Sequence, residues 1–360
     1  MIESVRRRVR RLAFGAATGV ALAVAVASPA LADPPGPTDY QSEVRSIDPA
    51  TPAIEVGIIG GDSFVDLRVE PGVEAMVVGY QGEDYLWFRP DGVVLENQNS
   101  PATYLNANRY GNDGVPATAR ADAEPVWKQV ATGGYWAWHD HRAHWMQSAR
   151  PFGLEAGDQI LEAVIPIVVD GDSVEVTVIS TWKPAPSPLA MWLGVVAGVG
   201  VGVGAWFLRR NRMPVIAAGV PLVVLALGVG AAQYFSLPSA TGPRPIWVVL
   251  PLIAAVSAAA GVLLAIRGMR FAADAAVLLV GVELAVWGVT KRDGLEAAIV
   301  PTDAPLWLDR FTTAGALVGG VLLVAIATWS LFAVPSETTD PPGPLSDSRE
   351  PSGSPRPAHP

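Results

Sequence analysis

Long apolar runs dominate the second half of the chain. Five of them follow residue 188, and each approaches the roughly 20 residues that an α-helix needs to cross the hydrocarbon core of a bilayer. Short loops with charged or turn-forming residues separate the runs. We therefore expect an all-α bundle of five transmembrane helices, at residues 189–208, 215–235, 246–266, 271–290 and 311–334.

Basic residues in two of these loops predict the orientation of the bundle. Arg209-Arg210-Asn211-Arg212 joins the first two runs, and Arg267-Gly268-Met269-Arg270 joins the third and fourth. The positive-inside rule places both loops in the cytoplasm. The loops at 236–245 and 291–310 are then outside the plasma membrane, and the C-terminus is cytoplasmic.

Residues 54–182 show a different pattern, in which short apolar stretches are separated by turn residues. Within Phe64-Val65-Asp66-Leu67-Arg68-Val69 the pattern alternates strictly, so Val65, Leu67 and Val69 share one face of a strand. Asp170-Gly171 between two apolar stretches is typical of a hairpin turn. This pattern predicts an extracytoplasmic antiparallel β-sandwich, with an immunoglobulin-like topology as the default. The expected strands are 54–59, 64–69, 75–80, 85–89, 93–95, 159–169 and 174–182.

The chain ends and the segments beside the β domain differ in composition from both domains. A basic start, an apolar stretch and Ala30-Leu31-Ala32 predict a signal peptide at 1–32, with an uncleaved anchor as the alternative. Residues 33–53 are interpreted as a loose lead-in, and residues 183–188 as a stiff proline-rich linker. The tail at 335–360 is rich in Pro, Ser and acidic residues, so we expect it to be disordered.

Charge is concentrated in the β domain. Residues 33–188 contain 23 acidic and 9 basic side chains, which gives this part a net charge of −14. A nucleic-acid partner needs a basic surface, so the expected partners are the lipid bilayer and an envelope protein rather than nucleic acid. The chain has no cysteine, which excludes disulfides and thiolate metal sites.

Three of the four histidines fall within six residues, in Tyr135-Trp136-Ala137-Trp138-His139-Asp140-His141-Arg142-Ala143-His144-Trp145-Met146. We call residues 135–146 the histidine segment. In an extended chain His139 and His141 project from the same face, and Asp140 from the opposite one. A turn at Arg142-Ala143 could bring His144 to the same ion. Three imidazoles suit zinc or copper, and Met146 offers a soft sulfur to Cu(I).

The histidine segment has two further interpretations. Histidine and tryptophan also mix in buried hydrogen-bonded networks, where Arg142 would pair with a carboxylate. A catalytic histidine is the third interpretation, but the chain has no G-x-S-x-G elbow, no phosphate-binding loop with a lysine and no H-E-x-x-H motif. The sequence favours binding or accessory work at the cell envelope, with copper or zinc as the ligand, over an enzyme. The alternative is a structural or protein-interaction module without a metal.

Two features lie inside the expected membrane helices. Glu283 is an acid well within the fourth run, and such a residue is a functional candidate in a transporter or membrane enzyme. A glutamate that faces Gln233 or a loop arginine would instead be satisfied structurally. In the first run, glycines repeat every four positions, which predicts close helix packing along two series: Gly194, Gly198 and Gly202, and Gly200 and Gly204.

The histidine segment has two companion motifs upstream, Gly79-Tyr80-x-Gly82-Glu83-x-Tyr85-Leu86 and Asn99-Ser100-Pro101-Ala102-x-Tyr104-Leu105-Asn106. Together the three motifs resemble those of uncharacterised multi-pass membrane proteins of actinobacteria. The resemblance covers the β domain and, by architecture, the membrane region. It implies an actinobacterial source and an envelope location, and it brings no specific activity.

Overall fold

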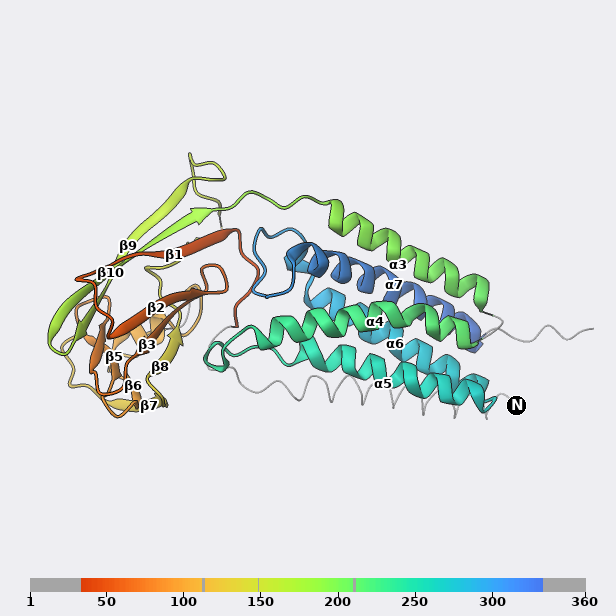
Figure 1. Ribbon diagram of the computed structural model, residues 1–360, viewed down its shortest axis with the longest axis horizontal. Coiled ribbons are helices and arrows are strands. Elements are labelled where there is room, and N and C mark those ends of the chain that lie inside the picture. Colours follow the sequence, from red (N-terminus) through yellow and green to blue (C-terminus); the bar gives the residue numbers. More distant parts are fainter. Residues whose placement is uncertain (1–33, 112–113, 148, 210–211, 333–360) are drawn as a thin grey trace, which may run out of the picture.

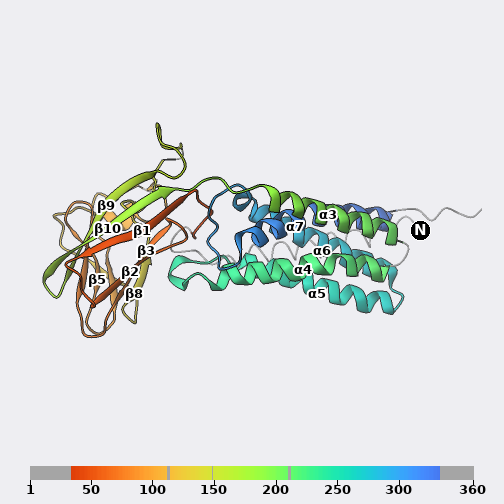
Figure 2. The same cartoon turned by 45° about the horizontal axis from the view of Figure 1, so that its top comes forward.

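A computed structural model describes residues 34–111, 114–147, 149–209 and 212–332 of the chain (Figure 1). A β domain and a bundle of long helices lie end to end, as both views show (Figures 1 and 2). The expected signal peptide and C-terminal tail fall outside the described residues. An antiparallel β domain followed by a helical bundle is the fold class that the sequence predicts.

The β domain consists of two antiparallel sheets. The larger sheet has seven strands in the order β1-β10-β9-β4-β5-β6-β7, and the smaller has three in the order β2-β3-β8. This seven-and-three division differs from the four and three strands of a constant-type immunoglobulin domain. The strands are β1 Tyr40–Asp48, β2 Ile54–Ile59, β3 Phe64–Val69, β4 Ala75–Val78, β5 Asp84–Phe88, β6 Val94–Asn97, β7 Trp127–Ala131, β8 Tyr135–Trp138, β9 Gln159–Val169 and β10 Asp172–Trp182.

Alternation along β3 explains how the smaller sheet contributes to the core. Val65, Leu67 and Val69 belong to one hydrophobic cluster with residues of the larger sheet, as their shared face predicts. Phe64 is on the opposite face and is nevertheless buried, because the ring of His139 stacks on it with 4.0 Å between ring centroids. The smaller sheet therefore carries a second buried contact on the side away from the core.

The hairpin between β9 and β10 forms at the expected place. Asp170 and Gly171 both have positive φ angles, 48° and 91°, and Val169 pairs directly with Asp172. Two positive φ angles are the requirement of a two-residue hairpin turn, which Asp-Gly satisfies. The β domain also begins earlier than expected, because residues 40–48 of the lead-in form the edge strand β1.

Among the described residues, five helices are long and apolar enough to cross a membrane, which points to a multi-pass membrane protein. Four of these spans match the predicted runs to within one residue, whereas α7 begins five residues before the predicted start at 311. The helices are α3 Leu189–Leu208, α4 Arg212–Phe235, α5 Ile246–Ile266, α6 Arg270–Thr290 and α7 Leu306–Phe332.

Only one of the two glycine series in α3 packs against another helix. Gly194 and Gly198 lie against the α7 backbone, where an added Cβ would collide with the carbonyl oxygens of Phe311 and Gly315. A Cβ on Gly200 or on Gly204 would meet nothing within 4 Å. Close packing is thus confirmed for the Gly194 series, whereas the side of α3 that carries Gly200 and Gly204 has open space where a side chain would begin.

The two ends of the bundle differ in what surrounds them. We call the end that faces the β domain the proximal end; it holds the connections 236–245 and 291–305 (Figure 1). The other, distal end holds the loops that follow α3 and α5. Exposed tryptophans occur near both ends, as is usual where helices leave the hydrocarbon: Trp192 and Trp307 near the proximal end, and Trp206 and Trp329 near the distal end.

Candidate functional site

The histidine segment leaves strand β8 in a tight turn. The strand ends at Trp138, and the amide of Ala143 donates to the carbonyl oxygen of Asp140 at 2.8 Å. The extended chain that would align His139 with His141 therefore stops at residue 138. The turn brings the ring of His144 to 6.3 Å from that of His139 and to 5.2 Å from that of His141, measured between centroids.

Asp140 is the polar centre of this turn. It is fully buried, and the guanidinium of Arg142 donates to both of its carboxylate oxygens at 2.8 Å. The indole Nε1 of Trp138 adds a third bond at 3.0 Å. Burial alone would raise the pKa of the Asp140 carboxyl, but the bonds and charge of Arg142 and the bond from Trp138 hold this pKa below its usual value. The pairing of Arg142 with a carboxylate is what the network interpretation predicts.

Each histidine ring bonds to a backbone carbonyl oxygen. Nδ1 of His139 bonds to Ser63 at 2.6 Å, Nε2 of His141 to Asn108 at 3.2 Å, and Nε2 of His144 to Arg109 at 2.7 Å. A carbonyl can only accept, so these ring nitrogens carry the hydrogen. The three histidines thus fix residues 108–109 and the start of β3 relative to β8.

Burial keeps two of these rings neutral. It lowers the pKa of His144 to about 3, with the nearby Arg109 charge acting in the same direction, and it also lowers the pKa of His141. Nδ1 of His144 is buried and has no hydrogen-bond partner among the described residues. Within the described part of the chain, no three His, Asp or Glu side chains form a group that could hold a metal ion, and Met146 lies half-buried beyond the turn.

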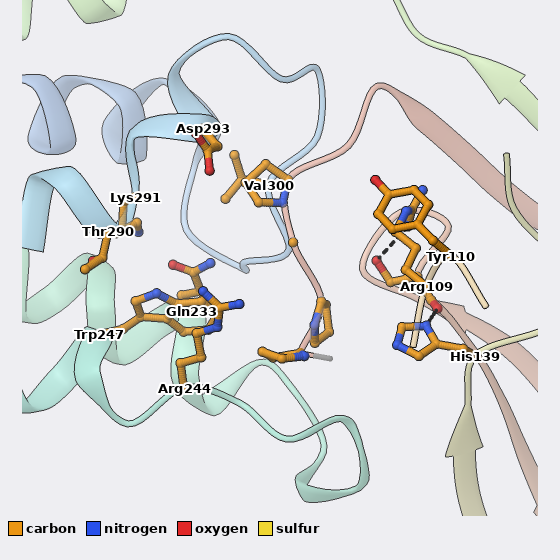
Figure 3. Close-up of a pocket in the computed structure, with 15 residues that line it drawn as sticks. Arg109, Tyr110, His139, Gln233, Arg244, Trp247, Thr290, Lys291, Asp293 and Val300 are labelled. Atoms are coloured by element: carbon orange, nitrogen blue, oxygen red, sulfur yellow. Dashed lines mark hydrogen bonds between the residues drawn. The ribbon is translucent and has the colours of Figure 1, made fainter. Parts of the chain in front are cut away.

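The histidine segment also helps to build a cavity of about 390 Å³ between the β domain and the proximal end of the bundle. We call it the junction cavity. Figure 3 shows the labelled residues of the two domains on opposite sides of it. From the β domain come Ser63, Arg109, Tyr110 and His139; from the bundle come Gln233, Arg244, Trp247, Thr290 and Lys291; residues 34–37, Asp293 and Val300 complete the lining.

The three cationic side chains of the cavity differ in their partners. Arg109 bonds to the buried carboxylate of Asp62 at 2.6 Å, and Lys291 bonds to that of Asp309 at 2.5 Å. Arg244 is exposed, and no ion pair joins it to any residue of the described structure. The amide oxygen Oε1 of Gln233, in a side chain that is only 2% exposed, likewise has no described hydrogen-bond partner. The lining of the cavity therefore includes one cation without an ion pair among the described residues, Arg244.

Backbone contacts hold the walls of the cavity together. Thr38 and Ile299 exchange two bonds, with N···O distances of 3.0 and 2.9 Å, and the Asp39 carboxylate accepts from the amide of Ala298 at 2.9 Å. Arg310, buried in the first turns of α7, donates to the carbonyls of Gly294, Ala297 and Ala298. The connection between α6 and α7 is thus fixed both to its own helix and to the chain that enters β1.

Glu283 is 2% exposed, and its Oε1 has no hydrogen-bond partner among the described residues. The expected pairing with Gln233 is not among the hydrogen bonds of the described structure, and Gln233 keeps its own unpartnered oxygen. Glu283 is not part of the junction cavity lining.

Several functional residues escaped the sequence analysis. Arg109 and Arg244 are isolated charges in loops, Lys291 begins the charged run Lys291-Arg292-Asp293 directly after a predicted helix, and none belongs to a recognisable motif. One signal was present: Asp309-Arg310 directly precedes the predicted fifth run, and charges so close to a membrane helix need partners. Comparison with protein-family models, with curated proteins and with solved structures finds no match for the chain.

Proposed function

We propose that this protein is a ligand-binding protein of the plasma membrane, with the β domain outside the cell, the C-terminus in the cytoplasm and the junction cavity as its binding site. The observation that carries this proposal is the unsatisfied lining of a cavity shared by two domains. Arg244 presents a cation with no described ion pair to this cavity, and polar side chains of both domains line it.

The orientation rests on the loops of the bundle. Basic residues are concentrated in the loops at the distal end, which the positive-inside rule assigns to the cytoplasm. The proximal end, the cavity and the β domain then face outwards. In this arrangement the cavity is open to molecules of the envelope and to the outer leaflet.

The histidine segment has a supporting role in this proposal. His144 and His141 hold the carbonyls of Arg109 and Asn108, and His139 itself lines the cavity. The segment therefore positions the β-domain wall through hydrogen bonds that its neutral rings donate.

A component that occupies the cavity should remain bound when the full-length protein is extracted in a mild detergent. Gly36 lines the cavity, and a Cβ added there meets nothing within 4 Å, so Gly36→Phe introduces a bulky side chain at the cavity without a clash at its Cβ. Gly114→Phe is the matched control, because a Cβ at Gly114 also meets nothing and this residue lies outside the lining. Native mass spectrometry should find a bound component on the wild type and on Gly114→Phe, and none on Gly36→Phe. Identical spectra for all three proteins would contradict the proposal.

A second candidate function is the binding of zinc or copper by His139, His141 and His144. It is favoured by the short distances between the rings and by the carbonyl that each ring contacts, because metal-bound histidines usually donate their other nitrogen in this way. The three histidine side chains would have to rotate so that one ring nitrogen of each points towards the same ion.

Titration of the full-length protein with Zn²⁺ and Cu²⁺ tests the metal site. Stoichiometric binding that is lost in His144→Ala but kept in His359→Ala would support it. Absence of binding at micromolar concentrations would rule it out and leave the supporting role alone.

A further inference from the structure

We infer that the outer face of the larger sheet is a docking surface for an envelope protein whose contact surface is apolar at its centre and carries lysine or arginine at its edge. This inference does not depend on the junction cavity, because none of the residues that carry it lines that cavity. Two features of the described structure support it: a row of apolar side chains across four neighbouring strands, and acidic side chains without ion pairs beside that row.

The row crosses the middle of the larger sheet. On a sheet face that points away from the core, the side chains of antiparallel strands are usually polar. Here the residues directly opposite one another on β9, β4, β5 and β6 are all apolar. Residues next to them along the strands belong to the core between the sheets, whereas these four do not and are only half-buried. We call them the apolar row: Val168, Met76, Trp87 and Leu95.

Further apolar side chains extend the row on both sides. Pro166 and Val164 precede Val168 at alternate positions of β9, and Val164 is 41% exposed. Trp127 on β7 lies beside Trp87, with 5.4 Å between the ring centroids. Tryptophan and methionine are enriched where proteins contact each other. A contiguous apolar patch on the outside of a domain is typical of an interaction site.

Acidic side chains border the row without a counter-charge. Asp48 on β1 pairs directly with Glu175 on β10, and Glu175 pairs on its other side with Pro166. Both acids are exposed, and like charges directly opposite each other on neighbouring strands destabilise a sheet. Glu74 is a third exposed acid, and its carboxylate accepts from Nε1 of Trp87 at 2.6 Å. None of the three acids has an ion pair among the described residues.

The arginines on this side of the sheet do not balance these acids. Arg45 pairs with Glu162 at 3.2 Å and Arg89 with Asp91 at 3.0 Å, so each arginine already has its own counter-charge. Lysine or arginine at the edge of a partner would relieve the repulsion between the remaining acids and would select that partner over others.

The position and charge of the row favour another protein as the occupant. β5 and β6 lie at the end of the molecule away from the bundle, so the row is remote from the bilayer (Figure 1). The net charge of −14 over residues 33–188 disfavours a second copy of this chain, because the two copies would repel each other. Three of the four side chains in the row are aliphatic, which suits the apolar side chains of a protein better than the hydroxyl groups of a polysaccharide.

Photo-crosslinking in the cells that make the full-length protein tests this surface directly. Benzoylphenylalanine is introduced at Leu95, in the apolar row, or at Arg68, which is exposed on the opposite side of the β domain, on the outer face of the smaller sheet. Irradiation should give one predominant adduct with another protein from position 95 and not from position 68. Mass spectrometry identifies that protein and the residue of it that is crosslinked, which should lie in an apolar surface flanked by lysine or arginine.

The identified protein is then purified, and its affinity for the full-length chain is measured in nanodiscs. Leu95→Gln should raise the Kd about tenfold, because an apolar side chain at the centre of the contact is lost. Glu175→Lys should raise the Kd about fivefold at low salt, and this effect should shrink as the salt concentration rises. Glu55→Lys is the matched control: Glu55 is an exposed glutamate on β2 of the smaller sheet, and the Kd should change less than about twofold.

The inference is overturned if position 95 gives no adduct, or if position 68 gives the same one. An adduct only with a second copy of the chain, or only with a polysaccharide, would also overturn it, since each is a different occupant. Equal effects of Glu175→Lys and Glu55→Lys would show that the acids beside the row do not recognise the partner. Glu175 is exposed, so this comparison remains decisive even if Leu95→Gln lowers the stability of the β domain.

Discussion

The histidine segment and the junction cavity are neighbouring polar regions that differ in the partners of their central polar groups, although Nδ1 of His144 in the segment also has no partner among the described residues. In the histidine segment the carboxylate of Asp140 is fully committed to Arg142 and Trp138, and each ring holds a backbone carbonyl. In the cavity, Arg244 and Gln233 keep groups that no described residue uses. Polar groups that satisfy one another stabilise a fold, and those left over are available to a ligand. The substitutions below should therefore have large effects on stability in the segment and small ones in the cavity.

Removal of the central carboxylate should have the largest effect. Asp140→Ala leaves the guanidinium of Arg142, whose side chain is 16% exposed, without its partner, and should cost about 3–5 kcal/mol. The free energy of opening can be measured by hydrogen exchange of the β8 amides in the full-length protein. Arg120–Asp122 has the same residue types at the same spacing and is exposed, so Asp122→Ala should leave exchange unchanged. Equal effects of Asp140→Ala and Asp122→Ala on this exchange would show that the buried ion pair stabilises the fold no more than the exposed one does.

Loss of one histidine should have the next largest effect. His144→Ala removes the 2.7 Å bond to the carbonyl of Arg109 and should destabilise the protein by about 1–3 kcal/mol. His141→Ala should cost less, because His141 is only half-buried and its carbonyl bond is longer, 3.2 Å. Thermal unfolding of the full-length variants tests this order. A His144→Ala protein as stable as the wild type would show that the bond from this ring to the carbonyl of Arg109 does not stabilise the fold.

Acid should weaken the same contact. The pKa of His144 is about 3 in the folded protein and about 6.5 in the unfolded chain, so between these values the unfolded state binds more protons. Stability contributed by neutral His144 is complete above pH 6.5 and is lost at about 1.4 kcal/mol per pH unit as the pH falls towards 3. The difference in unfolding free energy between wild type and His144→Gln, measured from pH 7.5 to 4.5, isolates this residue. A constant difference would contradict a buried neutral ring.

The smallest effect on stability is expected in the cavity. Arg244→Gln alters an exposed side chain with no ion pair in the described structure, so the free energy of unfolding should change by less than about 0.5 kcal/mol. Thermal unfolding without added ligand measures this. A loss as large as that of His144→Ala would mean that Arg244 supports the fold, and the contrast between the two regions would disappear.

The membrane bundle could be predicted almost completely because a bilayer imposes one requirement on every residue of a span. The exception is α7, whose first turn contains Asp309 and Arg310 and therefore resembles a loop. Both are buried because Lys291 and three loop carbonyls satisfy them. A local hydropathy pattern cannot reveal such partners of Asp309 and Arg310, because they lie about 10 to 20 residues away in the chain.

The β domain and the site could be predicted only in part. Strands with a buried apolar face, such as β3 and β10, were found, whereas β1 escaped because it is an edge strand with few buried positions. The turn that gathers the histidines could be anticipated from Arg142-Ala143. The cavity could not, because its walls come from chain segments as distant as residues 34–37 and Val300, and only the tertiary fold brings them together.

Asp39 limits how far the β domain can move. Its carbonyl oxygen accepts from the amide of Lys183 at 2.7 Å, and its carboxylate accepts from Ala298, so the first strand, the linker and the α6–α7 connection meet at one residue. The part of the linker between Lys183 and α3 that has no such bond is then only Pro184 to Pro188. It spans at most about 17 Å when fully extended. Three prolines stiffen it further. Besides this short linker, the bonds of Asp39 therefore attach the β domain directly to the proximal-end connection of the bundle, so the two domains have little freedom to separate.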